Sequence, residues 1–159
     1  FTSSMYVTSV VDGEVKVLLH MHDKLEIWLG VGGHIEKNEN PVEAALREAY
    51  EETGTEVQLI SFEKMLNTKD VKQVVTPQFV LEEHIPGING MSEHIHMDFI
   101  YFGYIKDYKK VRMKEKFNWF SKKDLKKMRL QFEVTKIAQK AIDAGIRFLE
   151  LYKNTIPAG

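Results

Sequence analysis

The stretch "GGHIEKNENPVEAALREAYEETGTEV", residues 32–57, contains both the start and the end signals of one helix. Asn40 is a good N-cap, Pro41 suits the first helical position, and Glu43 completes the spacing of a capping box. Gly54 belongs to the residue type that most often ends a helix. We therefore expect a helix that begins at Pro41 and ends before Gly54.

The last turns of this helix concentrate negative charge. At about 100° per residue, the side chains that can face a core gather on one side, namely Val42, Leu46, Ala49, Tyr50 and Thr53. Glu48, Glu51 and Glu52 gather on the other side, where they repel one another and meet the negative end of the helix dipole. Arg47 is close enough to Glu51 to pair with it. An arrangement that is unfavourable on two counts is expected at a functional site.

A hard divalent cation would offset this repulsion. Mg²⁺ binds oxygen ligands, and in proteins it commonly uses a few carboxylates together with substrate phosphates. Gly30, Gly32 and Gly33 would let the backbone, including a carbonyl group, approach such an ion closely. The alternative is a solvated acidic face on a surface helix, and composition alone does not choose between the two.

The spacing of the whole stretch resembles the Nudix box of the MutT/Nudix hydrolases. That pattern is a glycine, five residues, a glutamate, seven residues, Arg-Glu, an apolar residue, any residue, Glu-Glu, any residue, a glycine and an apolar residue. The matching residues are Gly33, Glu39, Arg47, Glu48, Ala49, Glu51, Glu52 and Gly54. Thr55 replaces the final apolar residue, and Val31 stands where many relatives have a proline.

This resemblance implies an α/β/α sandwich and the hydrolysis of a nucleoside diphosphate linked to another group, with Mg²⁺ or Mn²⁺ as cofactor. It implies that Glu48, Glu51 and Glu52 are catalytic metal ligands, and it adds the carbonyl of Gly32 as a further ligand. Arg47 would orient Glu51 or a neighbour. Gly33, Glu39 and Gly54 would have structural roles in the loop and helix. Both a box glutamate and a loop carboxylate remain candidates for the general base.

Candidate substrate-binding residues lie outside the box. The segment "HIHMDF" places His94, His96 and Asp98 on one face of a strand, which could either bind a transition metal or line a pocket. The candidates for an additional loop carboxylate are Glu82, Glu83, Glu93 and Glu115, with Glu115 favoured because it lies just before Trp119. The aromatic residues that could stack on a base are Trp28, Trp119, Phe79 and Tyr101.

The remaining sequence predicts a mixed β-sheet with helices packed on it. Asp12-Gly13 indicates a hairpin, and "IWLGVGG" a short strand that runs into a glycine turn. The further strands are expected at residues 56–62, 76–85, 94–105 and 117–120, and the further helices at 121–128 and 133–152.

Composition limits the remaining possibilities. The 159 residues fit one domain, residues 1–159, and the formal net charge of -1 gives no general attraction to nucleic acid or membrane. The chain has no cysteine, so disulfides, zinc-thiolate sites and a cysteine nucleophile are excluded. This absence fits a cytoplasmic protein, and we expect neither a membrane span nor a signal peptide.

The expected partner is a nucleotide-type small molecule. A nucleoside triphosphate, including an oxidised one, is favoured because the domain is small, and ADP-ribose comes second. The proline of many ADP-ribose hydrolases and the tyrosine of dinucleoside polyphosphate hydrolases are both absent near Asp70. The lysine-rich residues 106–129 keep an RNA 5′ end open as a substrate. A homodimer and a non-catalytic Nudix binding module also stay open, whereas the lack of cysteine argues against the isopentenyl diphosphate isomerase branch.

Overall fold

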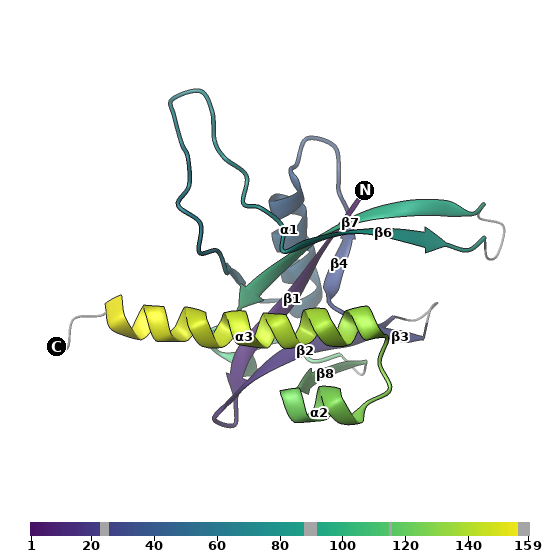
Figure 1. The fold of residues 1–159 in the computed structure, drawn as a ribbon, viewed down its shortest axis with the longest axis vertical. Coiled ribbons are helices and arrows are strands. Elements are labelled where there is room, and N and C mark those ends of the chain that lie inside the picture. Colours follow the sequence, from purple (N-terminus) through teal and green to yellow (C-terminus); the bar gives the residue numbers. More distant parts are fainter. Residues whose placement is uncertain (23–25, 88–91, 115, 156–159) are drawn as a thin grey trace.

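A computed structural model describes residues 1–22, 26–87, 92–114 and 116–155 of the chain, with residues 153–155 as backbone only (Figure 1). The strands are β1 (Thr2–Val11), β2 (Glu14–His22), β3 (Ile27–Leu29), β4 (Val31–His34), β5 (Gln58–Leu59), β6 (Phe79–Ile85), β7 (His94–Tyr104) and β8 (Phe117–Phe120). The helices are α1 (Pro41–Thr53), the 3₁₀ turn η1 (Tyr108–Lys110), α2 (Lys122–Lys127) and α3 (Phe132–Thr155). Within the described ranges, no helix is long and apolar enough to cross a membrane.

The strands form one mixed sheet. Its main path runs β3-β2-β1-β7-β5, while β4 pairs with β1, β6 with β7 and β8 with β2. The contact between β1 and β7 is parallel, and the other strand pairs are antiparallel. Helix α3 crosses in front of the sheet and α1 lies behind it, so the sheet is the middle layer of a sandwich (Figure 1). This arrangement confirms the predicted fold class.

Side-chain alternation along the strands divides the core into two layers. Tyr6 of β1 and Phe102 of β7 point toward α3, where they join its buried residues such as Ile137. Met5 and Tyr101 point the other way, into the cluster that packs under α1. Because successive strand residues face opposite sides, the residue number alone tells which layer a β1 or β7 side chain enters. Burying each large apolar side chain contributes about 1.5–3 kcal/mol of transfer free energy.

The turn residues and helix caps predicted from the sequence are present in the structure. Asp12 and Gly13 both adopt positive φ, 52° and 83°, and join β1 to β2. The Asn40 side chain accepts from the backbone of Val42 and Glu43, and the Glu43 side chain accepts in return from the Asn40 N–H. Gly54 ends α1 with φ 72°. A second capping box, between Ser121 and Asp124, begins α2.

Three expectations were wrong in part. The glycines of "IWLGVGG" do not form a turn, because residues 31–34 make strand β4, which pairs with the start of β1. The strand expected over residues 56–62 shortens to β5, which pairs only with the end of β7. Tyr50 is 56% exposed instead of buried. The buried stripe of α1 is centred on Ala45 and Ala49, and the phenol ring of Tyr50 falls outside it.

Candidate active site

The carboxylates of α1 meet the glycines of β4, since this helix packs against β1 and β4. Glu52 Oε1 accepts a hydrogen bond from the Gly32 N–H at 3.3 Å. Its other oxygen, Oε2, lies 2.9 Å from His20 Nδ1 on β2. The Glu52 side chain is 20% exposed, whereas that of Glu51 is 57% exposed. The helical wheel predicted that Glu48, Glu51 and Glu52 all lie on one side, away from the core. In the structure, Glu52 packs against the sheet.

Glycine at position 33 leaves the space that the Glu48 carboxylate occupies. A Cβ atom at Gly33 would lie 2.4 Å from Glu48 Oε1 and 2.5 Å from its carboxyl carbon. Only glycine is therefore compatible with Glu48 in this position. At the neighbouring Gly32 the obstruction is backbone, because a Cβ there would lie 2.6 Å from the carbonyl oxygen of Ser3. The double glycine thus brings α1 close to the β1–β4 pair.

Arg47 connects the helix to the loop that precedes it. Its Nη1 lies 2.8 Å from Glu48 Oε1 and 3.5 Å from Glu51 Oε2. Its Nη2 donates to Glu39 Oε1 at 2.8 Å and to the carbonyl oxygen of His34 at 3.1 Å. The hydrogen bond with Glu39, followed by that with Glu48, raises the pKa of Arg47 above its ordinary value. One guanidinium group therefore holds both the loop and two of the helix carboxylates.

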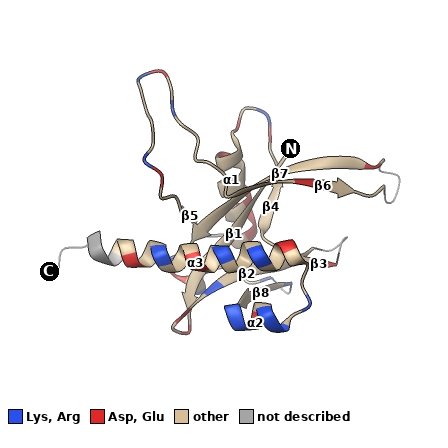
Figure 2. Cartoon of the chain, viewed as in Figure 1, with Lys and Arg blue, Asp and Glu red and all other residues tan. Residues whose placement is uncertain are grey.

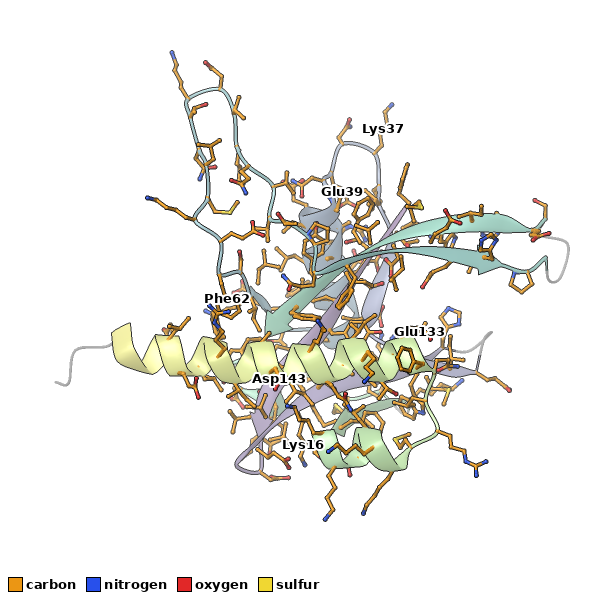
Figure 3. The ribbon with its side chains drawn as sticks, in the orientation of Figure 1. Lys16, Lys37, Glu39, Phe62, Glu133 and Asp143 are labelled. Atoms are coloured by element: carbon orange, nitrogen blue, oxygen red, sulfur yellow. The ribbon has the colours of Figure 1, made fainter. Side chains whose placement is uncertain are left out.

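Glu39 is held by Arg47 and by the backbone of its own loop. It lies at the foot of the loop before α1, while Lys37 is at the loop tip (Figure 3). Its Oε1 accepts from the Glu36 N–H at 2.7 Å in addition to binding Arg47. The hydrogen bond from Arg47 is the main cause that lowers the pKa of Glu39 below its ordinary value. These contacts support a structural role for Glu39.

The carboxylate oxygens near Gly32 are chemically suited as ligands of a hard divalent cation. Glu48 and Glu52 are carboxylates next to a backbone segment, and Glu51 lies one turn away on the more exposed side. As the side chains stand, no group of three or more His, Cys, Asp or Glu residues in the described part of the chain is arranged around a common ion position. In this ion-free arrangement, Arg47 contacts Glu48 and Glu51, and His20 contacts Glu52.

His20 is a site residue that the sequence reasoning missed. Leu18, two residues earlier on β2, belongs to the cluster under α1, so alternation places His20 on the same face. There its ring contacts Glu52 and lies edge-on to Phe117, with ring centroids 5.6 Å apart. The alternation of side chains along β2 could be predicted from the sequence. The contact between this strand and the last turn of α1 could not.

The histidine and aspartate face of β7 lies on the other side of the sheet. Ile100 and Phe102, which continue the alternation from Asp98, belong to the α3-side core. The structure therefore brings His94 and His96 together but does not bring them into contact with the glutamates of α1. His94 Nε2 and His96 Nε2 are 3.1 Å apart. The His34 ring is edge-on to the His96 ring, with ring centroids 5.2 Å apart.

Burial dominates the electrostatics of this second polar face. Asp98 is only 5% exposed, and its Oδ1 has no hydrogen-bond partner in the described structure. Burial raises the pKa of Asp98 above the ordinary carboxyl value. Burial is also the first cause that raises the pKa of the half-buried Glu83, followed by the charges of Asp98 and of Glu133 at the start of α3 (Figure 3). Burial, and then His34 and His94, lower the pKa of His96, which favours the neutral ring.

The aromatic candidates are mainly core residues. Trp28 packs edge-on against Phe120, with ring centroids 4.9 Å apart, and belongs to the α3-side layer. Tyr101 is 1% exposed, so it cannot stack on a base without leaving the core. Phe79 also packs against the α3-side core, and Trp119 against the layer under α1. Two of the four candidates for a loop carboxylate, Glu82 and Glu83, are not in a loop, because they lie within strand β6. Glu82 is 3.2 Å from His84, and Glu115 lies outside the described residues.

Comparison with known proteins agrees with this architecture. The family model of the NUDIX domain matches residues 2–141. A search of curated proteins found no match. A NUDIX-family hydrolase from Clostridium perfringens is 30% identical, with a TM-score of 0.67, over 90% of this chain and 95% of that one.

Two more distant structures share the fold. A mutT/nudix family protein from Listeria innocua is 20% identical, with a TM-score of 0.59, over 94% of this chain and 96% of that one. The Ap4A hydrolase of C. elegans is 16% identical, with a TM-score of 0.57, over 93% and 96% of the two chains. With the sandwich fold, the family-model match over residues 2–141 and the 30% identity to a NUDIX-family hydrolase show that the chain belongs to the Nudix family and is a Nudix hydrolase acting on phosphoric anhydride bonds.

Proposed function

We propose that the chain, as one domain of residues 1–159, hydrolyses a nucleoside diphosphate linked to another group. The favoured substrate is a nucleoside triphosphate, including an oxidised one, which would yield the monophosphate and pyrophosphate. The proposal relies mainly on the packing of the Glu48 carboxylate into the space left by Gly33, next to Arg47. A carboxylate held in this way beside a backbone segment suits metal-assisted attack of water on phosphorus.

In this proposal Glu48, Glu51 and Glu52 bind Mg²⁺ or Mn²⁺, with the carbonyl of Gly32 as a further ligand. The bound ion would neutralise phosphate charge and lower the pKa of the attacking water. Before the ion binds, Arg47 orients Glu48 and Glu51 through contacts of 2.8 and 3.5 Å. The chain thereby holds its carboxylates in place, which limits the reorganisation needed during the reaction.

His20 and Arg47 would keep their partners oriented when the ion is present. His20 contacts Oε2 of Glu52, while the Gly32 N–H contacts Oε1, so each oxygen already has a neighbour on the protein. A partner of this kind fixes the orientation of a metal-binding side chain and tunes its basicity. The candidates for the general base that takes the proton from water are a box glutamate and a loop carboxylate.

An RNA 5′ end is a second candidate because of the lysine-rich segment 106–129. Figure 2 shows the lysines of α2 together at the edge of the molecule below β8, away from α1. One of them, Lys122, already pairs with Asp143 of α3. If this surface binds a strand, hydrolysis of a 5′-triphosphate oligonucleotide should fall steeply with salt, whereas hydrolysis of a mononucleotide should not.

The decisive experiment is a substrate panel with Mg²⁺, with Mn²⁺ and with a chelator. The panel contains canonical and oxidised nucleoside triphosphates, ADP-ribose, a dinucleoside polyphosphate and a 5′-triphosphate oligonucleotide, and each reaction is analysed for phosphate, pyrophosphate and the nucleoside monophosphate. We expect metal-dependent release of pyrophosphate from a triphosphate. Activity on ADP-ribose alone would replace the favoured substrate. Inactivity across the panel with metal binding intact would favour a non-catalytic binding module.

A further inference from the structure

The ring nitrogens of two histidines face one another on the α3 side of β7. His94 and His96 are separated by one residue, so their side chains leave the strand on the same face. Their Nε2 atoms are 3.1 Å apart and their ring centroids 4.8 Å apart. The two Nε2 atoms therefore need either a shared proton or a shared cation between them.

The hydrogen bond of His94 to the backbone shows which of its nitrogens carries the proton. His94 Nδ1 lies 2.9 Å from the carbonyl oxygen of Ser92, which can only accept, so Nδ1 donates. The neutral His94 ring then presents an unprotonated Nε2 toward His96. A ring held through Nδ1 by a backbone carbonyl, with Nε2 free to bind, is the usual arrangement of a metal-binding histidine.

The separation of the two nitrogens fits a common metal ion. Two nitrogens that bind one tetrahedral zinc ion at about 2.0–2.1 Å lie roughly 3.3 Å apart. We propose that His94 and His96 form a two-histidine chelate for a borderline divalent transition ion, such as Zn²⁺, Co²⁺ or Ni²⁺. For the ion to bind, the proton on His96 Nε2 transfers through solvent to Nδ1 of the same ring.

This site differs from the carboxylate centre in position and in chemistry. It lies on the α3 side of the sheet, whereas Glu48 and Glu52 lie on the α1 side. Imidazole nitrogen suits zinc, nickel and copper, whereas magnesium prefers oxygen ligands. A saturating concentration of Mg²⁺ should therefore occupy the carboxylate centre and leave the histidine pair available.

Two acidic residues lie near the histidine pair, and water would complete the coordination of a bound ion. Glu83 lies directly opposite His96 in the β6–β7 ladder, and Asp98 follows on the same face of β7. The described residues contain no group of three or more protein side chains arranged to hold an ion. The remaining positions would therefore belong to water, and the ion would exchange with solvent.

The test is a titration of the full chain, free of any histidine tag, with Zn²⁺ in excess Mg²⁺. Isothermal calorimetry should detect one Zn²⁺ per chain for the native protein. His94→Ala and His96→Ala should each weaken Zn²⁺ binding at least about tenfold. His84→Ala is the matched control, because His84 lies on the opposite face of the same hairpin with its side chain 66% exposed. It should bind Zn²⁺ like the native chain.

A measurement on the native chain keeps the test valid if a variant fails to fold. In long-range ¹⁵N spectra, Zn²⁺ should shift the Nε2 resonances of His94 and His96 together and leave those of His84 in place. The proposal is overturned if the native chain does not bind Zn²⁺ in excess Mg²⁺. It is also overturned if either folded variant loses less than tenfold in affinity, or if the two Nε2 resonances do not move. None of these measurements depends on hydrolysis, so their failure would leave the proposed function untouched.

Discussion

Replacing Gly33 with alanine separates the catalytic geometry from the stability of the fold. The new methyl group would lie 2.4 Å from Glu48 Oε1, 2.9 Å from Oε2 and 2.5 Å from the carboxyl carbon. These atoms form the end of a flexible side chain, so the Glu48 carboxylate can move aside without disturbing α1 or β4. We therefore expect Gly33→Ala to fold normally and to lose activity.

The magnitude follows from the displacement. Ordinary van der Waals contact with a Cβ atom begins near 3.4 Å, so Glu48 Oε1 must move by about 1 Å, which would break its 2.8 Å contact with Arg47. A misplacement of about 1 Å at a catalytic centre can cost on the order of 100-fold in rate. The free energy of unfolding should change by less than about 1 kcal/mol, because only a side-chain terminus moves.

The assay compares Gly33→Ala with Glu48→Gln and the native chain. Turnover is measured against Mg²⁺ concentration with the most rapidly hydrolysed compound of the panel, and Mn²⁺ binding is measured separately by electron paramagnetic resonance. Both variants should lose turnover and bind Mn²⁺ more weakly, while thermal unfolding stays close to native. Native turnover and Mn²⁺ affinity in Gly33→Ala would refute the reasoning, because the Glu48 position would then not matter.

Other substitutions test separate parts of the structure. Gly32→Ala should lower the free energy of unfolding by about 2 kcal/mol, because its methyl group would lie 2.6 Å from a backbone carbonyl oxygen of β1. Chemical denaturation measures this change, and a denaturation midpoint equal to that of the native chain would contradict it. His20→Ala should weaken apparent Mg²⁺ affinity about tenfold by releasing Glu52, and an unchanged Mg²⁺ dependence of turnover would argue against this role. Asp124→Asn should cost about 0.5 kcal/mol at neutral pH. Its hydrogen bonds from Ser121 lower the pKa of Asp124, so this contribution is present above the unfolded-state pKa and is lost as the pH falls through the folded-state pKa. Denaturation curves of the native chain and Asp124→Asn should therefore converge in acid, and a constant difference would be evidence against the capping role.

Features set by neighbouring residues were predictable from sequence. The start of α1 needs only Asn40, Pro41 and Glu43, and its end needs only Gly54, so both were placed correctly. The same holds for the Asp12-Gly13 hairpin, whose positive φ angles are local properties. The order of strands and helices then followed from periodicity, and the spacing of the box indicated the family.

Features that depend on pairing between distant segments were not predictable. The pattern of residues 31–34 reads as a glycine turn until β1 lies alongside it, because glycine contributes little to a strand on its own. The His20–Glu52 contact needs β2 to lie beside the end of α1. Alternation predicted that His94 and His96 share a face, but only the sheet shows that this face is opposite to α1.

Glu52→Gln tests the central claim most directly, because Glu52 joins the helix to both Gly32 and His20. Turnover of the best panel substrate is measured at saturating Mg²⁺ and compared with Glu56→Gln, a change at an exposed glutamate just after the helix. If the carboxylates of α1 carry out metal-dependent hydrolysis, Glu52→Gln should lose at least about 100-fold in kcat while Glu56→Gln stays near native. Near-native turnover in Glu52→Gln would contradict the account.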